Sequence, residues 1–373
     1  MIPMPQFLFA TCQIGAEHAL KAEIAQSHPE LRSAFARPGF VTFKFVGDAA
    51  AGPGFRLRSK FARAWGFTAG KVDAAALGRE NACGKVWDLI APVPAARLHV
   101  WPRAGALPGT DDCDLPWPEE VTHLRKGLLE AASRDWSRKI ATLPPTEAEA
   151  APLGAWVADC ILVEPELWCV GYHRVETFHD AFPGGRPPLR LPAHAVSRAW
   201  LKMEEALRWS QPSCPAGTLW AELGSAPGGA AQALLEHGFH VLGVDPAEMH
   251  PDVLTHPNFT HLRQRTNQAS RKEFRKVRWL AADLNVAPNY TLRAVESLVR
   301  HGQIKIKGLL LTLKLVDWAL ADCLPEYLAR IRSWGYNAVR ARQLWHNRQE
   351  LCVAAVRDRG SRNAPPLPRG PSA

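Results

Sequence analysis

The stretch from Leu219 to Asp245 constrains the fold of this chain more than any other segment. An apolar run, Leu219–Leu223, stops at a glycine; a helical run at 230–237 follows, and the apolar segment 239–244 leads to Asp245. The pattern predicts a βαβ unit, which in an open α/β sheet binds a nucleoside cofactor at the carboxyl ends of its strands, where Asp245 would meet the ribose hydroxyls. An ordinary crossover with a glycine-rich turn has the same pattern.

The turn itself, GSAPGG at 224–229, distinguishes between classes of cofactor. A dinucleotide fingerprint is spaced GxGxxG, and a Walker A loop ends in GK followed by Ser or Thr. This turn has neither, because it contains a proline and two adjacent glycines and no lysine follows it. A ligand without a pyrophosphate, such as S-adenosylmethionine (SAM), is therefore favoured.

The same segment carries a family resemblance. The motif ELGSAPGG resembles the ELGxxPGG or DLGxxPGG motif of FtsJ-like RNA 2'-O-ribose methyltransferases. The resemblance implies that SAM is bound by Glu222, Gly224, Ser225, Ala226, Pro227, Gly228, Gly229 and Asp245, and that Asp283 also contacts it.

Length and composition describe an ordinary globular protein. The 373 residues suggest two or three domains, and 47% hydrophobic with 22% charged residues is typical of soluble proteins. No apolar run approaches the roughly 18 residues of a membrane span. No basic residue precedes Lys21, so a signal peptide is not expected and we expect a cytoplasmic protein. The eight cysteines form no CxxC, which predicts reduced thiols and no metal site.

Charge is unevenly distributed along the chain. Residues 1–185 hold 19 Lys and Arg against 21 Asp and Glu, whereas residues 186–373 hold 26 against 15. A basic half suits a polyanionic partner such as RNA, although a charge run is more often a solvated face. The densest group of cations, called here the basic cluster, is Arg263, Arg265, Arg271, Lys272, Arg275, Lys276 and Arg278.

The first 180 residues are expected to form two small domains, at 1–90 and 91–180. In the first domain, ATCQIGAEHALKAE at 10–23 resembles the opening of THUMP-containing RNA modification enzymes. The domain at 91–180 resembles a THUMP domain, which implies RNA binding; a generic α+β domain without a ligand is the alternative. The expected elements are strands Phe7–Cys12, Val41–Val46 and Arg97–Trp101, helices Gly15–Ser27 and 119–136, and a hairpin of Trp156–Val163 with Leu167–His173.

A proline- and glycine-rich stretch, Phe182–Pro192, predicts an interdomain linker. The segment SRAWLKMEEAL at 197–207 then predicts a helix that is capped near Ser197. It resembles the SRAYxKLxE segment that precedes the glycine loop in ribose methyltransferases, which implies a catalytic Lys202 and a cofactor contact from Ser197.

Three further polar residues lie at the ends of apolar strands. Asp283 follows a strand at 278–282, Lys314 lies within the apolar run 307–315, and Glu350 immediately precedes the strand 351–356. Ligands collect at strand ends in an open α/β sheet, and a lysine is rarely buried without a reason.

Lys202, Asp283, Lys314 and Glu350 match the K-D-K-E tetrad of the FtsJ-like enzymes. With the THUMP-like half, the chain resembles the RlmM family, whose members are 23S ribosomal RNA cytidine 2'-O-ribose methyltransferases. The resemblance implies that Lys314 is the catalytic base. Burial and the neighbouring Lys202 would have to lower its pKa, whereas Asp283 and Glu350 would orient its amine and oppose that shift. Two departures stand out: Ala230 replaces a bulky aromatic residue, and Arg265 replaces an acidic residue that contacts the adenine.

The sequence as a whole predicts an α/β protein, with a Rossmann-like SAM-dependent methyltransferase domain at 181–358 behind an α+β, THUMP-like RNA-binding half. Residues 359–373 are expected to be a disordered tail. The predicted activity is 2'-O-ribose methylation of structured RNA, with a cytidine of 23S ribosomal RNA as the target. A non-catalytic RNA-binding protein with a degenerate fold and a nicotinamide-dependent oxidoreductase are the alternatives.

Overall fold

The computed structural model describes residues 4–47, 52, 54–103, 118–132 and 150–357. The chain forms two compact units, residues 1–188 and 189–373, which are described separately below. The predicted tail at 359–373 lies outside the described residues. Within the described ranges, no helix has both the length and the apolar character needed to cross a membrane.

The first unit is built on one curled sheet with the strand order β2-β3-β1-β4-β7-β6-β5. All neighbouring strands pair antiparallel except β5 and β6, which are parallel. Its strands are β1 (Phe7–Thr11), β2 (Leu31–Arg37), β3 (Phe40–Phe45), β4 (Ala64–Asp73), β5 (Ala95–Pro102), β6 (Trp156–Glu164) and β7 (Leu167–Arg174). Its helices are α1 (Glu17–Ser27), α2 (Ala74–Leu77), α3 (Arg79–Ile90), α4 (Glu119–Glu130) and the short η2 (His179–Ala181) and η3 (Pro183–Gly185).

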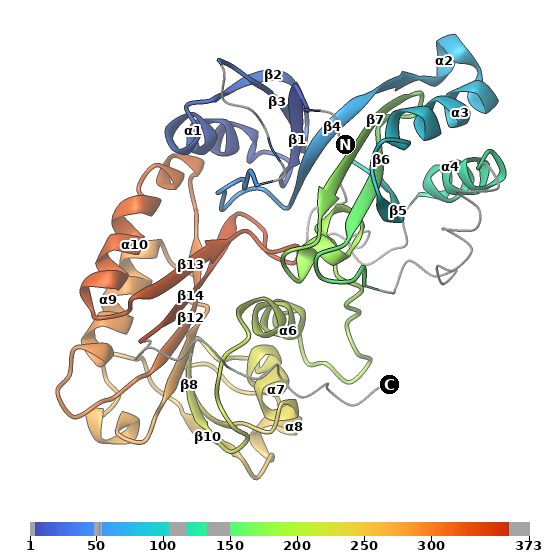
Figure 1. Ribbon diagram of the computed structural model, residues 1–373. Helices are drawn as coiled ribbons and strands as arrows, with labels where there is room; N and C mark the ends of the chain where they lie inside the picture. The colour runs from blue at the N-terminus through green and yellow to red at the C-terminus, as the bar shows by residue number, and fades with distance from the viewer. Residues whose placement is uncertain (1–3, 48–51, 53, 104–117, 133–149, 358–373) are drawn as a thin grey trace. The chain divides into compact units, whose positions relative to one another are not determined.

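A hydrophobic core lies between this sheet and helices α3 and α4, which run beside each other in Figure 1. Trp87 of α3 is buried there and donates from its indole N–H to the carbonyl of Leu128 in α4, at 2.8 Å. The single sheet takes strands from both sides of the predicted boundary at residue 90. The subdivision into 1–90 and 91–180, and its likeness to a THUMP domain, stay predictions.

The predicted linker at 182–192 is wrong in its first part. Residues 182–185 are buried within the first unit, and the division between the units falls after Pro188. Gly184 and Gly185 both have positive φ, at 62° and 71°. A Cβ on Gly184 would lie 2.9 Å from the ring of Trp101. These glycines therefore allow the backbone to pack closely against the sheet, where the sequence suggested a flexible joint.

The second unit has the order β10-β9-β8-β11-β12-β14-β13, with parallel pairing from β10 to β12. β14 returns antiparallel between β12 and β13. The strands are β8 (Leu219–Leu223), β9 (His240–Val244), β10 (Phe259–Leu262), β11 (Trp279–Ala282), β12 (Gly308–Lys314), β13 (Ala338–Arg342) and β14 (Glu350–Val356). The helices are α6 (Ala199–Ser210), α7 (Gly229–Glu236), α8 (Pro251–Leu254), α9 (Pro288–Val299), α10 (Leu324–Ser333) and the short η4 (Arg271–Phe274) and η5 (Trp318–Ala321).

Helices cover both faces of this sheet, with α6 and α7 on one face and α9 and α10 on the other (Figure 1). Strands buried on both faces must be apolar along their whole length, which explains the continuous apolar runs of β8 and β12. The prediction of a Rossmann-like doubly wound domain is confirmed. Glu350, expected just before the last strand, is the first residue of β14.

Candidate active site

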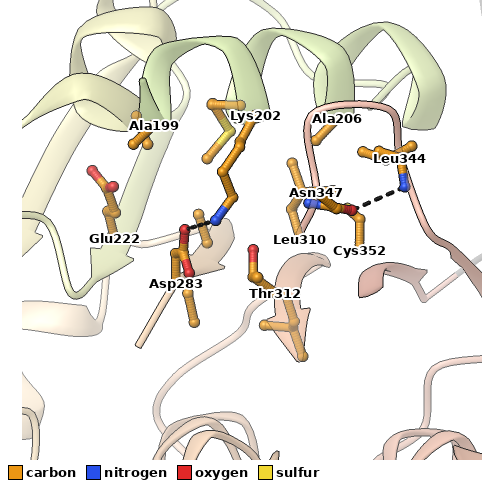
Figure 2. A pocket seen from close by; sticks show the side chains of 15 residues that line it. Ala199, Lys202, Ala206, Glu222, Asp283, Leu310, Thr312, Leu344, Asn347 and Cys352 are labelled. Atoms are coloured by element: carbon orange, nitrogen blue, oxygen red, sulfur yellow. Dashed lines mark hydrogen bonds and ion pairs between the residues drawn. The ribbon is translucent and has the colours of Figure 1, made fainter. Parts of the chain in front are cut away.

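Four charged residues predicted from the sequence lie together at one edge of the second sheet. Asp283 directly follows β11, and Lys314 is the last residue of β12, so both lie at the carboxyl ends of parallel strands. Glu350 begins β14 and is the register partner of Lys314 across the antiparallel pair. Lys202 extends from α6 toward Asp283, as Figure 2 shows.

The four side chains form a closed ring of alternating charge. Lys202 Nζ lies 2.5 Å from Asp283 Oδ2 and 2.7 Å from Glu350 Oε1. Lys314 Nζ lies 3.0 Å from Asp283 Oδ1 and 2.9 Å from Glu350 Oε2. Glu350 is 6% exposed, and the other three side chains are 19 to 22% exposed. Each charge is thus compensated, yet both amines keep some contact with solvent.

The electrostatics of this ring correct one expectation. Burial lowers the pKa of Lys314, but the carboxylates of Asp283 and Glu350 raise it by more, so the pKa of Lys314 is raised above its ordinary value. Burial raises the pKa of Asp283, but the two lysines lower it by more, so the pKa of Asp283 is lowered. The lowered pKa that a catalytic base needs is therefore not found in the protein alone. As expected, the two carboxylates oppose it, and because their effect outweighs that of burial, the amine holds its proton at neutral pH.

The glycine loop lies beside this ring because three glycines permit close contacts. Gly224 has φ 81°, and a Cβ there would be 2.8 Å from the carbonyl oxygen of Asp283. Gly228 has φ 122° and precedes α7, and its Cβ would meet Val253. A Cβ on Gly229 would overlap the hydroxyl of Ser197. Side chains at these positions would push apart the loop, Asp283 and the start of α6.

Asp245 follows β9, as predicted, and its carboxylate already accepts two backbone hydrogen bonds. Oδ2 accepts from Ala226 N at 3.2 Å, and Oδ1 accepts from Ala247 N at 2.8 Å. Asp245 therefore fixes the glycine loop to the end of β9. Each carboxylate oxygen retains a second acceptor position, so contact with ribose hydroxyls stays compatible with this arrangement.

Two of the predicted cofactor residues present buried polar atoms that fit a ligand. Among the described residues, Ser197 Oγ and Glu222 Oε2 have no hydrogen-bond partner. Burial, followed by the charges of Asp283 and Asp245, raises the pKa of Glu222 well above its ordinary value. A protonated carboxyl can both donate and accept a hydrogen bond. The cap of α6 is Arg198, directly after Ser197 and so near the predicted place, and no side chain forms a capping hydrogen bond there.

A small cavity of about 20 Å³ joins Glu222 to the charged ring (Figure 2). Its lining includes Lys202, Asp283, Thr312 and Asn347. This volume exceeds the roughly 10 to 15 Å³ that one water molecule needs, and the polar lining could satisfy it. The cavity therefore provides room for a hydrogen-bonding group between Glu222 and the ring.

Sequence reasoning missed a buried carboxylate that joins two parts of the site. Glu205 lies one turn after Lys202 in α6 and has no exposed surface. Its carboxylate accepts from the backbone N–H groups of Trp345 at 2.7 Å and His346 at 2.8 Å. Glu205 thus connects the helix that carries Lys202 to the segment that leads into Glu350. Its spacing of three from Lys202 was the only signal in the sequence.

The basic cluster is divided between opposite edges of the sheet. Arg263 and Arg265 follow β10, at the edge that carries the charged ring, and Arg263 pairs with Glu248 at 2.9 Å. Arg278 lies at the other edge, where its backbone N–H donates a hydrogen bond to the carbonyl of Leu219 at the start of β8. Arg271 and Arg275 contact Ser297 and Gln303, which lie near the end of α9 and in the connection to β12. The cluster is therefore not one continuous surface beside the charged ring.

The two departures from the family pattern are located as follows. Ala230 is buried at the start of α7 and lines the small cavity. Arg265 is exposed, and its backbone N–H donates to the side chain of Gln268 at 3.2 Å. A loss of the acidic adenine contact at Arg265 stays a prediction.

Comparisons of the sequence with known proteins identify the family of this chain. Residues 195–337 match the family of FtsJ-like methyltransferases. A ribosomal RNA large subunit methyltransferase M of Alkalilimnicola ehrlichii is 30% identical over 308 residues, which cover 80% of this chain and 79% of the relative. The chain therefore belongs to the family of ribosomal RNA large subunit methyltransferase M, with an FtsJ-like methyltransferase domain. The protein of the same name from Halorhodospira halophila is 32% identical over half of this chain, an alignment that spans 54% of that relative.

Among solved structures, TrmN from Thermus thermophilus aligns with 94% of this chain and 99% of its own. Its sequence identity of 15% and TM-score of 0.33 are too low to carry an argument. The family assignment therefore depends on the sequence relatives and the FtsJ-like match.

Proposed function

We propose that the protein transfers the methyl group of SAM to a ribose 2'-hydroxyl of large-subunit ribosomal RNA, at a cytidine of the 23S molecule. The observation that carries this proposal is the closed ring of Lys202, Asp283, Lys314 and Glu350 beside the glycine loop. A degenerate, non-catalytic domain would have no need to keep two lysines and two carboxylates in mutual contact. The relatives named for ribosomal RNA methylation support the substrate class.

The buried polar atoms and the close-packed glycines fit SAM. In this proposal the loop 224–229, Ser197 and Glu222 hold the cofactor, and Asp245 accepts from its ribose hydroxyls. SAM supplies an electrophilic methyl group on a sulfonium.

The protein's own residues then act on the RNA hydroxyl. Asp283 and Glu350 fix the Lys314 amine between them, which orients it for proton transfer. Only the deprotonated amine can accept the hydroxyl proton, and the carboxylates favour the protonated form. In this proposal Lys202 offsets part of that charge, and the reactive fraction grows as the pH rises.

We further propose that the first unit selects the RNA and that the second performs the transfer. Electrostatic attraction is independent of sequence, so discrimination has to come from shape and base contacts. The isolated second unit, residues 189–373, is expected to bind SAM and to lose target selectivity. Full target methylation by that unit would show that the first unit has another task.

The direct test is to incubate the full-length protein with labelled SAM and total RNA, and to map the modified nucleoside. The expected product is a single 2'-O-methylated cytidine in the large-subunit RNA. A labelled base in place of a labelled ribose would overturn the reaction, and labelled small-subunit RNA would overturn the substrate. Heat-inactivated protein controls for chemical methylation.

A further inference from the structure

The first unit contains a large cavity that the proposed reaction does not use. Its volume is about 680 Å³, within the range of roughly 300 to 1,000 Å³ that small-molecule sites occupy. Its walls come from five strands and the end of α3, and include Phe7, Phe35, Lys71, Leu89 and Tyr172. The cavity therefore combines an apolar interior with a cation.

The curvature of the sheet creates this cavity. Lys71 lies on β4 and Phe35 on β2, and strands β3 and β1 separate them in the sheet. Even so, the Lys71 ammonium lies 4.2 Å from the centre of the Phe35 ring. The sheet must curl strongly to bring these two strands together, and both residues of the contact line the cavity.

A ligand could replace the Phe35 ring as the partner of the Lys71 ammonium. Lys71 is exposed, and a cation–π contact at an exposed site is weak because water competes for the cation. Within the described part of the chain, no carboxylate pairs with Lys71. The second cation near the ring, Arg37 at 4.6 Å, is partly neutralised because its Nε donates to Glu164 at 2.6 Å. Lys71 is thus the cation available to an anionic group.

A β-bulge in β4 places backbone polar groups in the same wall of the cavity. The register between β4 and β7 shifts between Thr68 and Gly70, which leaves Ala69 out of the ladder. Thr68, Ala69 and Gly70 all line the cavity. Bulges of this kind leave the extra residue unpaired and are common beside binding sites. The wall therefore offers backbone hydrogen-bonding groups next to apolar side chains.

We propose that this cavity binds one nucleotide of a single-stranded segment of the RNA substrate, with the base among the aromatic and aliphatic walls and its phosphate at Lys71. A nucleotide matches the site because it joins a flat, stackable base to an anion. A purely apolar ligand would leave Lys71 and the bulge unused, and a small inorganic anion would leave the apolar walls unused. The inference depends on the proposed function for the nature of the ligand.

The test uses the full-length protein and a short, mixed-sequence, single-stranded RNA with a fluorescent label. Phe35→Ala should weaken binding by about fivefold or more, because loss of an aromatic contact to a base costs about 1 kcal/mol at least. Lys71→Gln should weaken binding and reduce the slope of log affinity against log salt by about 0.7, the contribution of one phosphate on a single strand. Phe35→Ala should leave that slope unchanged.

Lys85→Gln is the matched control, since Lys85 is an exposed lysine of α3 that does not line the cavity. Thermal unfolding of each variant checks that the first unit is intact. Ultraviolet crosslinking of the same RNA should label peptides that line the cavity. Crosslinks confined to other peptides, or wild-type affinity and salt slope in both variants, would overturn the inference.

Failure of this inference can be told apart from failure of the proposed function. If Phe35→Ala and Lys71→Gln bind RNA normally while the wild-type protein methylates ribosomal RNA, only the cavity assignment is wrong. If both variants lose RNA affinity although the wild-type protein methylates no RNA, the nucleotide site stands and the proposed reaction is wrong.

Discussion

The two edges of the second sheet use charge in opposite ways. At the carboxyl edge, two lysines and two carboxylates are in contact and largely shielded from solvent. At the amino edge, Lys272, Arg275, Lys276 and Arg278 are exposed, and only Glu273 stands among them in the sequence. Counting charges along the chain singles out the second group. The proposed chemistry depends on the first, because compensated charges in a shielded site act on each other strongly, whereas exposed charges are screened.

The sharpest test of the carboxyl edge is Lys314→Arg. Arginine can keep ion pairs with Asp283 and Glu350 but does not lose its proton at accessible pH. Transfer should fall by about 10²- to 10⁴-fold, the usual contribution of a general base. Single-turnover rates with saturating SAM measure the effect, and calorimetry should find SAM affinity close to wild type. A wild-type rate in this variant would exclude Lys314 as the base.

The pH dependence of the wild-type rate tests the same edge without a mutation. Because its carboxylate neighbours raise the pKa of Lys314, the free amine is the minor form at neutral pH. The logarithm of kcat/KM should rise by one for each pH unit and should not level off below the ordinary lysine pKa of about 10.4. A plateau beginning near neutral pH would contradict a raised pKa in the free protein.

A smaller loss is expected from Glu205→Gln. The amide would turn an N–H donor toward one of two backbone N–H groups, at Trp345 or His346, and loosen the link between α6 and the segment before Glu350. Small displacements of catalytic groups are costly, so kcat should fall about tenfold with little change in KM for SAM. Glu204→Gln is the control, because the neighbouring Glu204 pairs with Arg208 and His237 instead. Equal losses in both variants would mean that general helix stability is responsible.

The smallest effect is expected at the amino edge. Replacing Arg271, Lys272, Arg275 and Lys276 with glutamine should weaken RNA binding and flatten its salt dependence, since each phosphate contact adds to the salt slope. The rate at saturating RNA and the affinity for SAM should stay at wild-type values, because these residues lie at the edge away from the charged ring. RNA affinity unchanged at several salt concentrations would assign the cluster to a solvated face.

Much of the second unit could be predicted because its strands are buried on both faces. The strand Leu219–Leu223 has the same bounds in the sequence and in the structure. In the first unit, β4 was missed because Gly66 and Gly70 interrupt its apolar pattern. The sequence cannot show that both glycines have close neighbours, with a Cβ on Gly66 only 2.8 Å from the Phe9 ring.

The candidate site, like the fold, could be predicted only in part. The resemblance to the K-D-K-E tetrad identified Lys202, Asp283, Lys314 and Glu350, and for the last three a strand end fixes where the residue lies. The carboxylates' effect on the pKa of Lys314 was expected, but that it outweighs the effect of burial could not be inferred, since the balance depends on distances between side chains far apart in the chain. The division of the basic cluster between two edges also depends on the fold. The segment that carries the cluster begins at the carboxyl end of β10 and finishes at the amino end of β11.

The pairing of Lys314 with Glu350 in strand register has a consequence for preparing this protein. Adjacent residues of a strand point to opposite faces, so a slip of one residue between β12 and β14 would turn Glu350 away from Lys314. Misassembled molecules should therefore be inactive and not merely slow. Active-site titration of a refolded sample would then count the molecules whose two strands have joined correctly.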